Sequence, residues 1–331
     1  MVVPDEVMSW LIEGPSWVKY RANIDLLGSS RTEQEGLWAQ VKREPLVCDL
    51  LARVDSWPWP RLTSHRSAGH PLHKLVFLAD LGFTEKDPEM RPIIGRLLEH
   101  REPDGPFQMV ANISEHYGGT GQDVRAWALC DSPSIAYALA TMGLVDDHRV
   151  RKAVSHLRGL ARSNGWPCAV SKELGKFRGP GRKGDPCPYA NLLMLKLLSL
   201  EPSWRDSTEA RGGVEAALSL WSRSRTEHPY QFYMGTDFRK LKAPFIWYDI
   251  MHVAEVLSRF PWAAKDERLR EMIAIIRGKM DGEGRLTPES VWMDWKRWEF
   301  GQKSEPSRWL TLSAYRVLDR CDGGVASKSS L

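Results

Sequence analysis

The sequence predicts an all-α protein of helical hairpins that close into a ring. First, a unit recurs along the chain: an apolar helix, a short turn, a more charged helix, and a loop that contains Asp-Gly, Asn-Gly or Glu-Gly. Second, the alternation of apolar and polar residues that marks a half-buried strand is missing. A repeated helix pair cannot bury its apolar face alone, so its copies are expected to stack on one another.

The copies of the unit are clearest over 70–107, 132–168 and 246–286. Apolar residues recur in them at helical spacing, as between Leu72 and Ala79. In each pair the first helix is mostly apolar and the second is more charged. We therefore expect the first helices to form the inner wall of the ring and the second helices to face solvent.

Six hairpins follow from this reading, and all are expected within residues 1–320 as one domain with a central pocket. Residues 321–331 are expected to be a disordered tail. The expected helices are 15–27 with 31–54, 70–83 with 88–102, 132–143 with 147–162, 187–200 with 208–225, 246–259 with 265–279, and 307–320 with 4–13 as its candidate partner. Gly36 and Pro45 predict interruptions of the helix over 31–54.

Long loops enter the inner helices and would crowd one end of the ring. They cover 103–131, 163–186, 226–245 and 280–306. Loops of this length in a compact domain are usually functional or disordered. The Gly-rich, basic stretch over 176–186 is expected to be mobile.

Composition excludes some classes of protein. The chain has 331 residues, of which 42% are hydrophobic and 27% charged, as in a soluble globular protein. The net charge of +4 is too small for a duplex-DNA protein and is compatible with an anionic small molecule. Five cysteines, an odd number, and a start unlike a signal peptide predict reduced thiols and a cytoplasmic location. No apolar run has the length of a membrane span.

Fifteen tryptophans are an unusual number, and many lie at junctions between loops and helices. A tryptophan buries much area and carries one hydrogen-bond donor, so it suits the wall of a pocket. We expect most of them to fill gaps between helices and a minority to line a pocket.

The loops that end the repeats, PDGPF, RSNGWPC and DGEGRL, resemble the glutamine–tryptophan repeats of terpenoid cyclases and protein prenyltransferases. Over about residues 15–320 the chain is similar to the six-hairpin toroid of that superfamily, and more particularly to small bacterial proteins termed squalene-cyclase-like. The resemblance implies an (α/α)6 toroid, and terpenoid or prenyl chemistry is the function it implies. Folds host many chemistries, so the residues must carry the functional argument.

Two motifs of the superfamily are missing from the sequence. There is no DxDD, the motif that supplies the acid of squalene cyclases, and no DDxxD, the motif that binds metal-bridged diphosphate. The nearest acidic pair, Asp146 and Asp147, falls in a turn between helices. We expect it to cap the helix that begins at His148.

The resemblance to protein prenyltransferases also implies a zinc site. Their zinc is held by Asp-x-Cys at the start of an inner helix and by a later histidine, and Asp185, Cys187 and His252 match this pattern. Thiolate, imidazole and carboxylate are ligands that zinc accepts. The alternative is a buried thiol at a helix start. Cys130 holds the equivalent place in the preceding repeat, which favours that structural role.

A cluster of basic and aromatic residues could bind an anionic group such as diphosphate, phosphate or carboxylate. Hairpins one, five and six would be adjacent in a closed ring. The candidates for anion and substrate binding are Arg239, Lys240, Lys242 and Lys303, with Tyr20, Trp247 and Trp309 along the apolar part. The alternative for the basic residues is a solvated rim with ordinary ion pairs.

Catalytic candidates lie in the segment WYDIMH over 247–252. Asp249 and His252 are three residues apart and would share one face of a helix, where they could act as a general acid–base pair next to Tyr248. The alternative is that Asp249 caps the helix or pairs with a lysine. His70 and His73 have the same spacing.

The leading function is therefore an enzyme that acts on a small, partly apolar, anionic substrate in the central pocket. A non-catalytic module that binds a carbohydrate or a nucleic-acid segment through a basic, Trp-rich mouth is the alternative from another class. A hydrolase or lyase of acidic saccharides is a third. Beyond zinc, the sequence indicates no cofactor.

Overall fold

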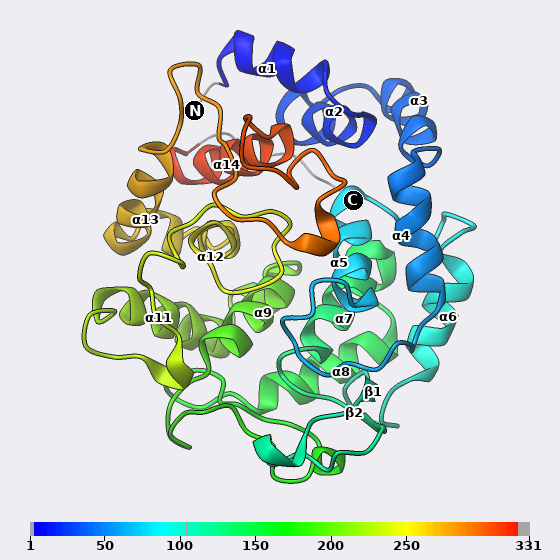
Figure 1. The fold of residues 1–331 in the computed structure, drawn as a ribbon, viewed down its shortest axis with the longest axis vertical. Coiled ribbons are helices and arrows are strands. Elements are labelled where there is room, and N and C mark those ends of the chain that lie inside the picture. The colour runs from blue at the N-terminus through cyan, green and yellow to red at the C-terminus, as the bar shows by residue number, and fades with distance from the viewer. Residues whose placement is uncertain (1–2, 104, 324–331) are drawn as a thin grey trace. The chain divides into compact units, whose positions relative to one another are not determined.

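The computed structural model describes residues 3–103 and 105–323 (Figure 1). It is mostly helical, which confirms the predicted all-α class. In this part of the chain the α-helices are α1 (Asp5–Ile12), α2 (Ser16–Ala22), α3 (Arg31–Val41), α4 (Pro45–Asp55), α5 (Pro71–Leu81), α6 (Arg91–Glu99), α7 (Ser132–Leu139), α8 (His148–Gly159), α9 (Pro188–Leu198), α10 (Pro202–Arg205), α11 (Thr208–Ser222), α12 (Ile250–Leu257), α13 (Glu267–Arg277) and α14 (Arg308–Cys321). Not one of these described helices combines the length and the apolar character that crossing a membrane requires.

The chain divides into two compact units. Unit 1 combines the residues up to Asp49 with those from Gly235 onward, and unit 2 spans Leu50–Met234. The closure of six hairpins into one toroid over residues 1–320 stays a prediction. Of the predicted tail, Cys321 belongs to α14, and residues 324–331 lie outside the described part of the chain.

In unit 2 the helices alternate between fully buried and half-buried ones. α7 packs against α5, α8 and α9, and α9 packs against α11 (Figure 1). Every residue of α7 and α9 is buried, whereas α8 buries one stripe from Val150 to Leu157. This matches the predicted difference in burial between the apolar first helix and the charged second helix of a pair.

Unit 1 follows the same principle. α12 is buried along its whole length and packs against α13 and α14, while α14 also contacts α1 and α2. α13 buries only the stripe that contains Leu269, Met272, Ile273 and Ile276. Both termini of the described chain therefore contribute helices to the unit that surrounds α12.

Several helix ends differ from the predicted ones for local reasons. α12 begins at Ile250 rather than 246, because the side chain of Asp249 caps it. α3 runs through Gly36, so the predicted interruption there is wrong. A glycine inside a helix costs only about 1 kcal/mol, which neighbouring packing readily offsets. Pro45 does begin a new helix, as predicted, because proline fits the first helical position.

A small antiparallel hairpin lies inside the long loop 103–131, where no strand is predicted. β1 (Met109–Ala111) pairs with β2 (Val124–Ala126), with Met109 opposite Ala126. Strands of three residues are too short to show alternation, and β1 is buried throughout. The sequence pattern therefore contains no signal that could reveal this hairpin.

Tryptophans fill gaps in both units, as expected for most of them. Trp166 is fully buried and donates its ring N–H to the carbonyl of Leu157 at 2.9 Å. In unit 1 the ring of Trp298 lies 4.8 Å from Trp17 and 5.8 Å from Trp295. Edge and tilted contacts of this kind add stability beyond the buried area.

The predicted cap of α8 is present in the turn before this helix. Asp147 accepts a hydrogen bond from the backbone N–H of Arg149 at 2.8 Å, and its bonds with the Arg149 guanidinium lower its pKa to about 2. Asp147→Ala is therefore expected to reduce the free energy of unfolding by about 1 kcal/mol at pH 7 in urea denaturation. Asp146→Ala is the matched control, because Asp146 is exposed and caps nothing among the described residues. Equal losses in the two variants would contradict the cap.

Candidate functional site

The start of α12 carries the predicted acid Asp249. Its side chain is 1% exposed, and Oδ1 accepts a hydrogen bond from the backbone N–H of His252 at 3.0 Å. Oδ2 is buried and has no hydrogen-bond partner among the described residues. Burial disfavours the carboxylate and raises the pKa of Asp249 to about 7, although the backbone bonds from His252 and Met251 and the charge of Lys242 act to lower it. This carboxyl can therefore hold a proton near neutral pH.

The imidazole of His252 is held in one orientation. Its Nδ1 lies 2.8 Å from the carbonyl oxygen of Trp247, and its ring stacks on Phe245 at 5.5 Å. A carbonyl only accepts hydrogen bonds, so Nδ1 carries a proton, and in the neutral ring Nε2 carries the lone pair. The structure thus places His252 in the first turn of α12 and Asp249 just before it, at the N-cap, where Asp249 caps the helix as the alternative interpretation predicted. Proton transfer by them stays a prediction.

Two of the predicted anion-binding lysines share one acidic partner. Lys242 lies 3.1 Å from Asp237 and Lys240 lies 3.5 Å from it. Although burial alone would raise it, the pKa of Asp237 is lowered by the bonds from Lys242 and Lys240. Lys242 is itself buried, with its ammonium 6.0 Å from the ring of Trp292. Asp237, which was not among the predicted site residues, partly neutralises these cations.

The remaining basic candidates and Tyr20 lie nearer the surface. Arg239 and Lys303 are exposed. Tyr20 is half-buried in α2, and its ring is 4.9 Å from that of Trp38. Their role in substrate binding stays a prediction.

The other aromatic candidates have structural contacts. Tyr248 is buried, with its ring 5.5 Å from Phe238, and Trp247 is half-buried. Trp309 is buried in the first turn of α14, where its backbone N–H donates to Glu299 at 2.8 Å. Burial raises the pKa of Glu299, whose carboxylate also accepts from Ser307.

The predicted zinc ligands are divided between the units, with Asp185 and Cys187 in unit 2 and His252 in unit 1. Among the residues that the structure describes, no group of three or more His, Cys, Asp or Glu side chains is arranged to hold a metal ion. Cys187 is buried and forms a hydrogen bond with Cys130. That bond and burial raise the pKa of the Cys130 thiol well above its ordinary value. The zinc site therefore stays a prediction, and the proposed chemistry does not use it.

Unit 2 contains a second buried acid, Asp131, which was not among the predicted site residues. Asp131 is 1% exposed and caps the turn before α7, accepting from the Ala128 N–H at 2.8 Å. Its Oδ2 is 3.9 Å from Nδ1 of His65, whose ring nitrogens are buried without hydrogen-bond partners among the described residues. Burial raises the pKa of Asp131 to about 7 and lowers that of His65 to about 4. His65 lies in a loop, so no helical spacing pointed to the pair.

The two histidines at the start of α5 anchor the preceding loop. His70 accepts from the backbone N–H of Leu72 through Nδ1, so its Nε2 donates to the carbonyl of Pro60 at 2.9 Å. His73 Nε2 lies 3.1 Å from the carbonyl of His65. Burial lowers the pKa of His70 to about 4 and that of His73 to about 3. At neutral pH both rings are uncharged and position the segment that carries His65.

No protein-family model matches the chain, and no curated protein matches it. Among solved structures, it is similar to the type II terpene cyclase MstE from Scytonema in its apo form, at 12% sequence identity. The match covers 93% of this chain and 87% of that one, with a TM-score of 0.40. A likeness at this level does not assign the chain to a family.

Proposed function

We propose that the chain is an enzyme that transfers a proton to or from a small, partly apolar, anionic substrate, with terpenoid or prenyl chemistry as its reaction class. Asp249 is the proton carrier. The observation that supports this role is its buried Oδ2, which has no hydrogen-bond partner among the described residues, together with the pKa near 7. A general acid or base works best when its pKa lies near the working pH.

A capping role alone accounts for only one oxygen of Asp249. Oδ1 receives the bond that a helix start needs. A second oxygen buried without a partner costs free energy, and a cap does not require it. Asp266, which caps α13, is only half-buried and bonds the Arg268 side chain with both oxygens. The buried Oδ2 of Asp249 therefore supports a chemical role.

In this proposal the surrounding side chains divide the remaining tasks. Lys242 and Lys240, with Arg239 and Lys303, hold the anionic group, because cationic side chains bind carboxylate and phosphate oxygens. Trp247 contacts the apolar part. The face of an indole ring also stabilises positive charge that develops on a substrate.

The titration of Asp249 tests the proton carrier directly. In carbon-13 NMR of aspartate-labelled protein, one carboxyl resonance is expected to titrate near pH 7 and to be missing in Asp249→Asn. An unfolded aspartate releases its proton near 4, so the stability of wild type relative to this variant should fall as pH rises from about 4 to about 7. Titration of Asp249 near 4 would contradict the proposal.

The reaction class is tested by incubating the protein with linear isoprenyl diphosphates in deuterated water. Mass spectrometry should detect a product that carries deuterium, because the transferred proton comes from a group in exchange with solvent. Binding of acidic oligosaccharides or single-stranded DNA without any turnover of isoprenyl compounds would favour the alternative of a binding module.

A further inference from the structure

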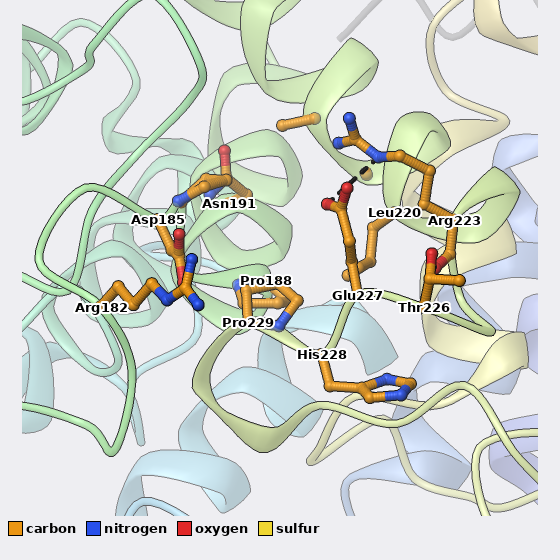
Figure 2. A pocket seen from close by; sticks show the side chains of 13 residues that line it. Arg182, Asp185, Pro188, Asn191, Leu220, Arg223, Thr226, Glu227, His228 and Pro229 are labelled. Carbon is orange, nitrogen blue, oxygen red and sulfur yellow. Dashed lines mark hydrogen bonds and ion pairs between the residues drawn. The ribbon is translucent and has the colours of Figure 1, made fainter.

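Unit 2 contains a cavity of about 450 Å³, and the proposed proton transfer uses none of its lining residues (Figure 2). It lies between the Gly-rich loop 176–186, the start of α9 and the end of α11 with the segment that follows. Ligand pockets are commonly of this size. Its lining residues are Arg182, Asp185, Pro186, Pro188, Asn191, Ala216, Ala217, Leu220, Arg223, Thr226, Glu227, His228 and Pro229.

The segment after α11 packs tightly against the Gly-rich loop beside the cavity. Tyr230 and Gln231 have φ angles of 54° and 59°, in the left-handed region that non-glycine residues rarely adopt. The buried ring of Tyr230 packs so closely on the Gly-rich loop that a Cβ at Gly181 would lie 2.6 Å from it. Such strain persists only where the surroundings impose it, and it concentrates at ligand sites. The Gly-rich loop is thus packed against Tyr230, and its mobility stays a prediction.

Each of two opposite walls of the cavity carries one positive and one negative side chain. Arg182 and Asp185 come from one turn of the Gly-rich loop, and across the opening Arg223 pairs with Glu227 at 3.2 Å (Figure 2). Among the described residues, neither Arg182 nor Asp185 has a side-chain partner. These two groups are therefore available to a ligand.

Between the charged walls the lining is mostly apolar. Pro188 and Pro229 lie between the two walls in Figure 2, and Leu220 and Ala217 at the end of α11 are buried. In the same lining, Nδ1 of His228 is buried without a hydrogen-bond partner among the described residues. A buried polar atom of this kind costs free energy unless a ligand or water satisfies it.

We propose that this cavity binds a small zwitterion with an apolar body, of the chemical type of an α-amino acid. Arg182 receives its carboxylate, Asp185 receives its ammonium group, and the proline and leucine surfaces cover its side chain. The four charged lining residues sum to zero, so a simple anion would meet the repulsion of Asp185 and Glu227, and a simple cation that of Arg182 and Arg223.

Every residue that lines the cavity belongs to unit 2, whereas Asp249 belongs to unit 1. The proposed site also gives Asp185 a role that needs no metal. Asn191 supports the site from α9, because its side-chain amide bonds both the N–H and the carbonyl of Trp166 and so fixes the segment before the Gly-rich loop.

The test compares three probes that share one apolar body. L-Phenylalanine carries both charges, 3-phenylpropanoate only the negative one, and 2-phenylethylamine only the positive one. NMR titrations of the full chain labelled with nitrogen-15 should show that L-phenylalanine binds about five- to tenfold more tightly than either analogue. Shifted amide signals should map to residues 182–191 and 223–229. Equal affinities, or no binding of any probe up to about 10 mM, would overturn the proposal.

Two variants assign the charges. Arg182→Gln should weaken the binding of L-phenylalanine about five- to tenfold, and 2-phenylethylamine should bind to this variant as tightly as to wild type or more tightly. Asp185→Asn should bind L-phenylalanine no more tightly than 3-phenylpropanoate. Lys183→Gln is the matched control, because Lys183 is exposed in the same turn and does not line the cavity. A loss in the control as large as that of Arg182→Gln would also overturn the proposal.

Discussion

Asp249→Asn is expected to lower turnover about a hundredfold to ten-thousandfold, the range that general acid–base catalysis contributes. Asparagine has almost the same shape as aspartate, and its side-chain oxygen can still accept the bond from the His252 N–H. It caps helices as well as aspartate does. It has no carboxyl group, however, and cannot hold or release a proton at neutral pH. The variant thus separates the chemical role from the structural one.

The matched control is Asp266→Asn at the start of α13 in the same unit. Asp266 accepts from the backbone N–H of Arg268 at 2.9 Å, and the bonds from the Arg268 side chain lower its pKa. It is therefore a cap that stays ionised. This variant should retain wild-type turnover, and product formation from the isoprenyl substrate measures both. If Asp249→Asn turned over like wild type, Asp249 would leave the mechanism, and Asp131 beside His65 would become the next residue to test.

The sequence predicts the helices well, because burial of one face leaves a periodic pattern along the chain. α7 and α9 are mostly apolar and are buried throughout, while α8 alternates and buries one stripe. The role of Asp147 was also predictable, since a cap depends only on residues adjacent in sequence. β1 and β2 left no such pattern, because each has only three residues.

The candidate site was predictable only where it is local. Asp249 and His252 are three residues apart at the N-cap and in the first turn of α12, and this spacing in the sequence revealed them. The Asp131–His65 pair joins a helix start to a loop far away in sequence, which spacing cannot show. Likewise, the lysines at 240 and 242 were recognised as cations, but their shared partner Asp237 depends on the fold of the loop that precedes them.

Glu255→Gln is expected to lower the free energy of unfolding by about 3 kcal/mol, because it breaks a buried ion cluster. Glu255 is 3% exposed near the end of α12 and lies 2.7 Å from Arg259 and 3.4 Å from Arg320. Arg320 also donates to Ser258 at 3.0 Å, and burial lowers its pKa to about 10. Without the carboxylate, two guanidinium groups would remain close together in a site with little water to screen them.

The control for this change is Glu35→Gln. Glu35 pairs with Arg31 at the same spacing of four residues, but both side chains are exposed. Such surface pairs contribute little, so the expected loss is below about 0.5 kcal/mol. Urea denaturation at pH 7 measures both variants. Equal losses would mean that the cluster around Glu255 is solvated and contributes no more than a surface pair.

A second substitution distinguishes two causes of the stability loss in Glu255→Gln: the lost attraction of the ion pairs and the unpaired charges that remain. If the loss in Glu255→Gln comes mainly from two uncompensated guanidinium groups, then adding Arg259→Gln should recover part of the stability, because one of those charges is removed. If the lost attraction dominates, the double variant should be no more stable than Glu255→Gln. The result bears on the proposed chemistry as well. α12 carries Asp249 at its start and Glu255 near its end, so the cluster anchors the helix whose first turn orients the proton carrier.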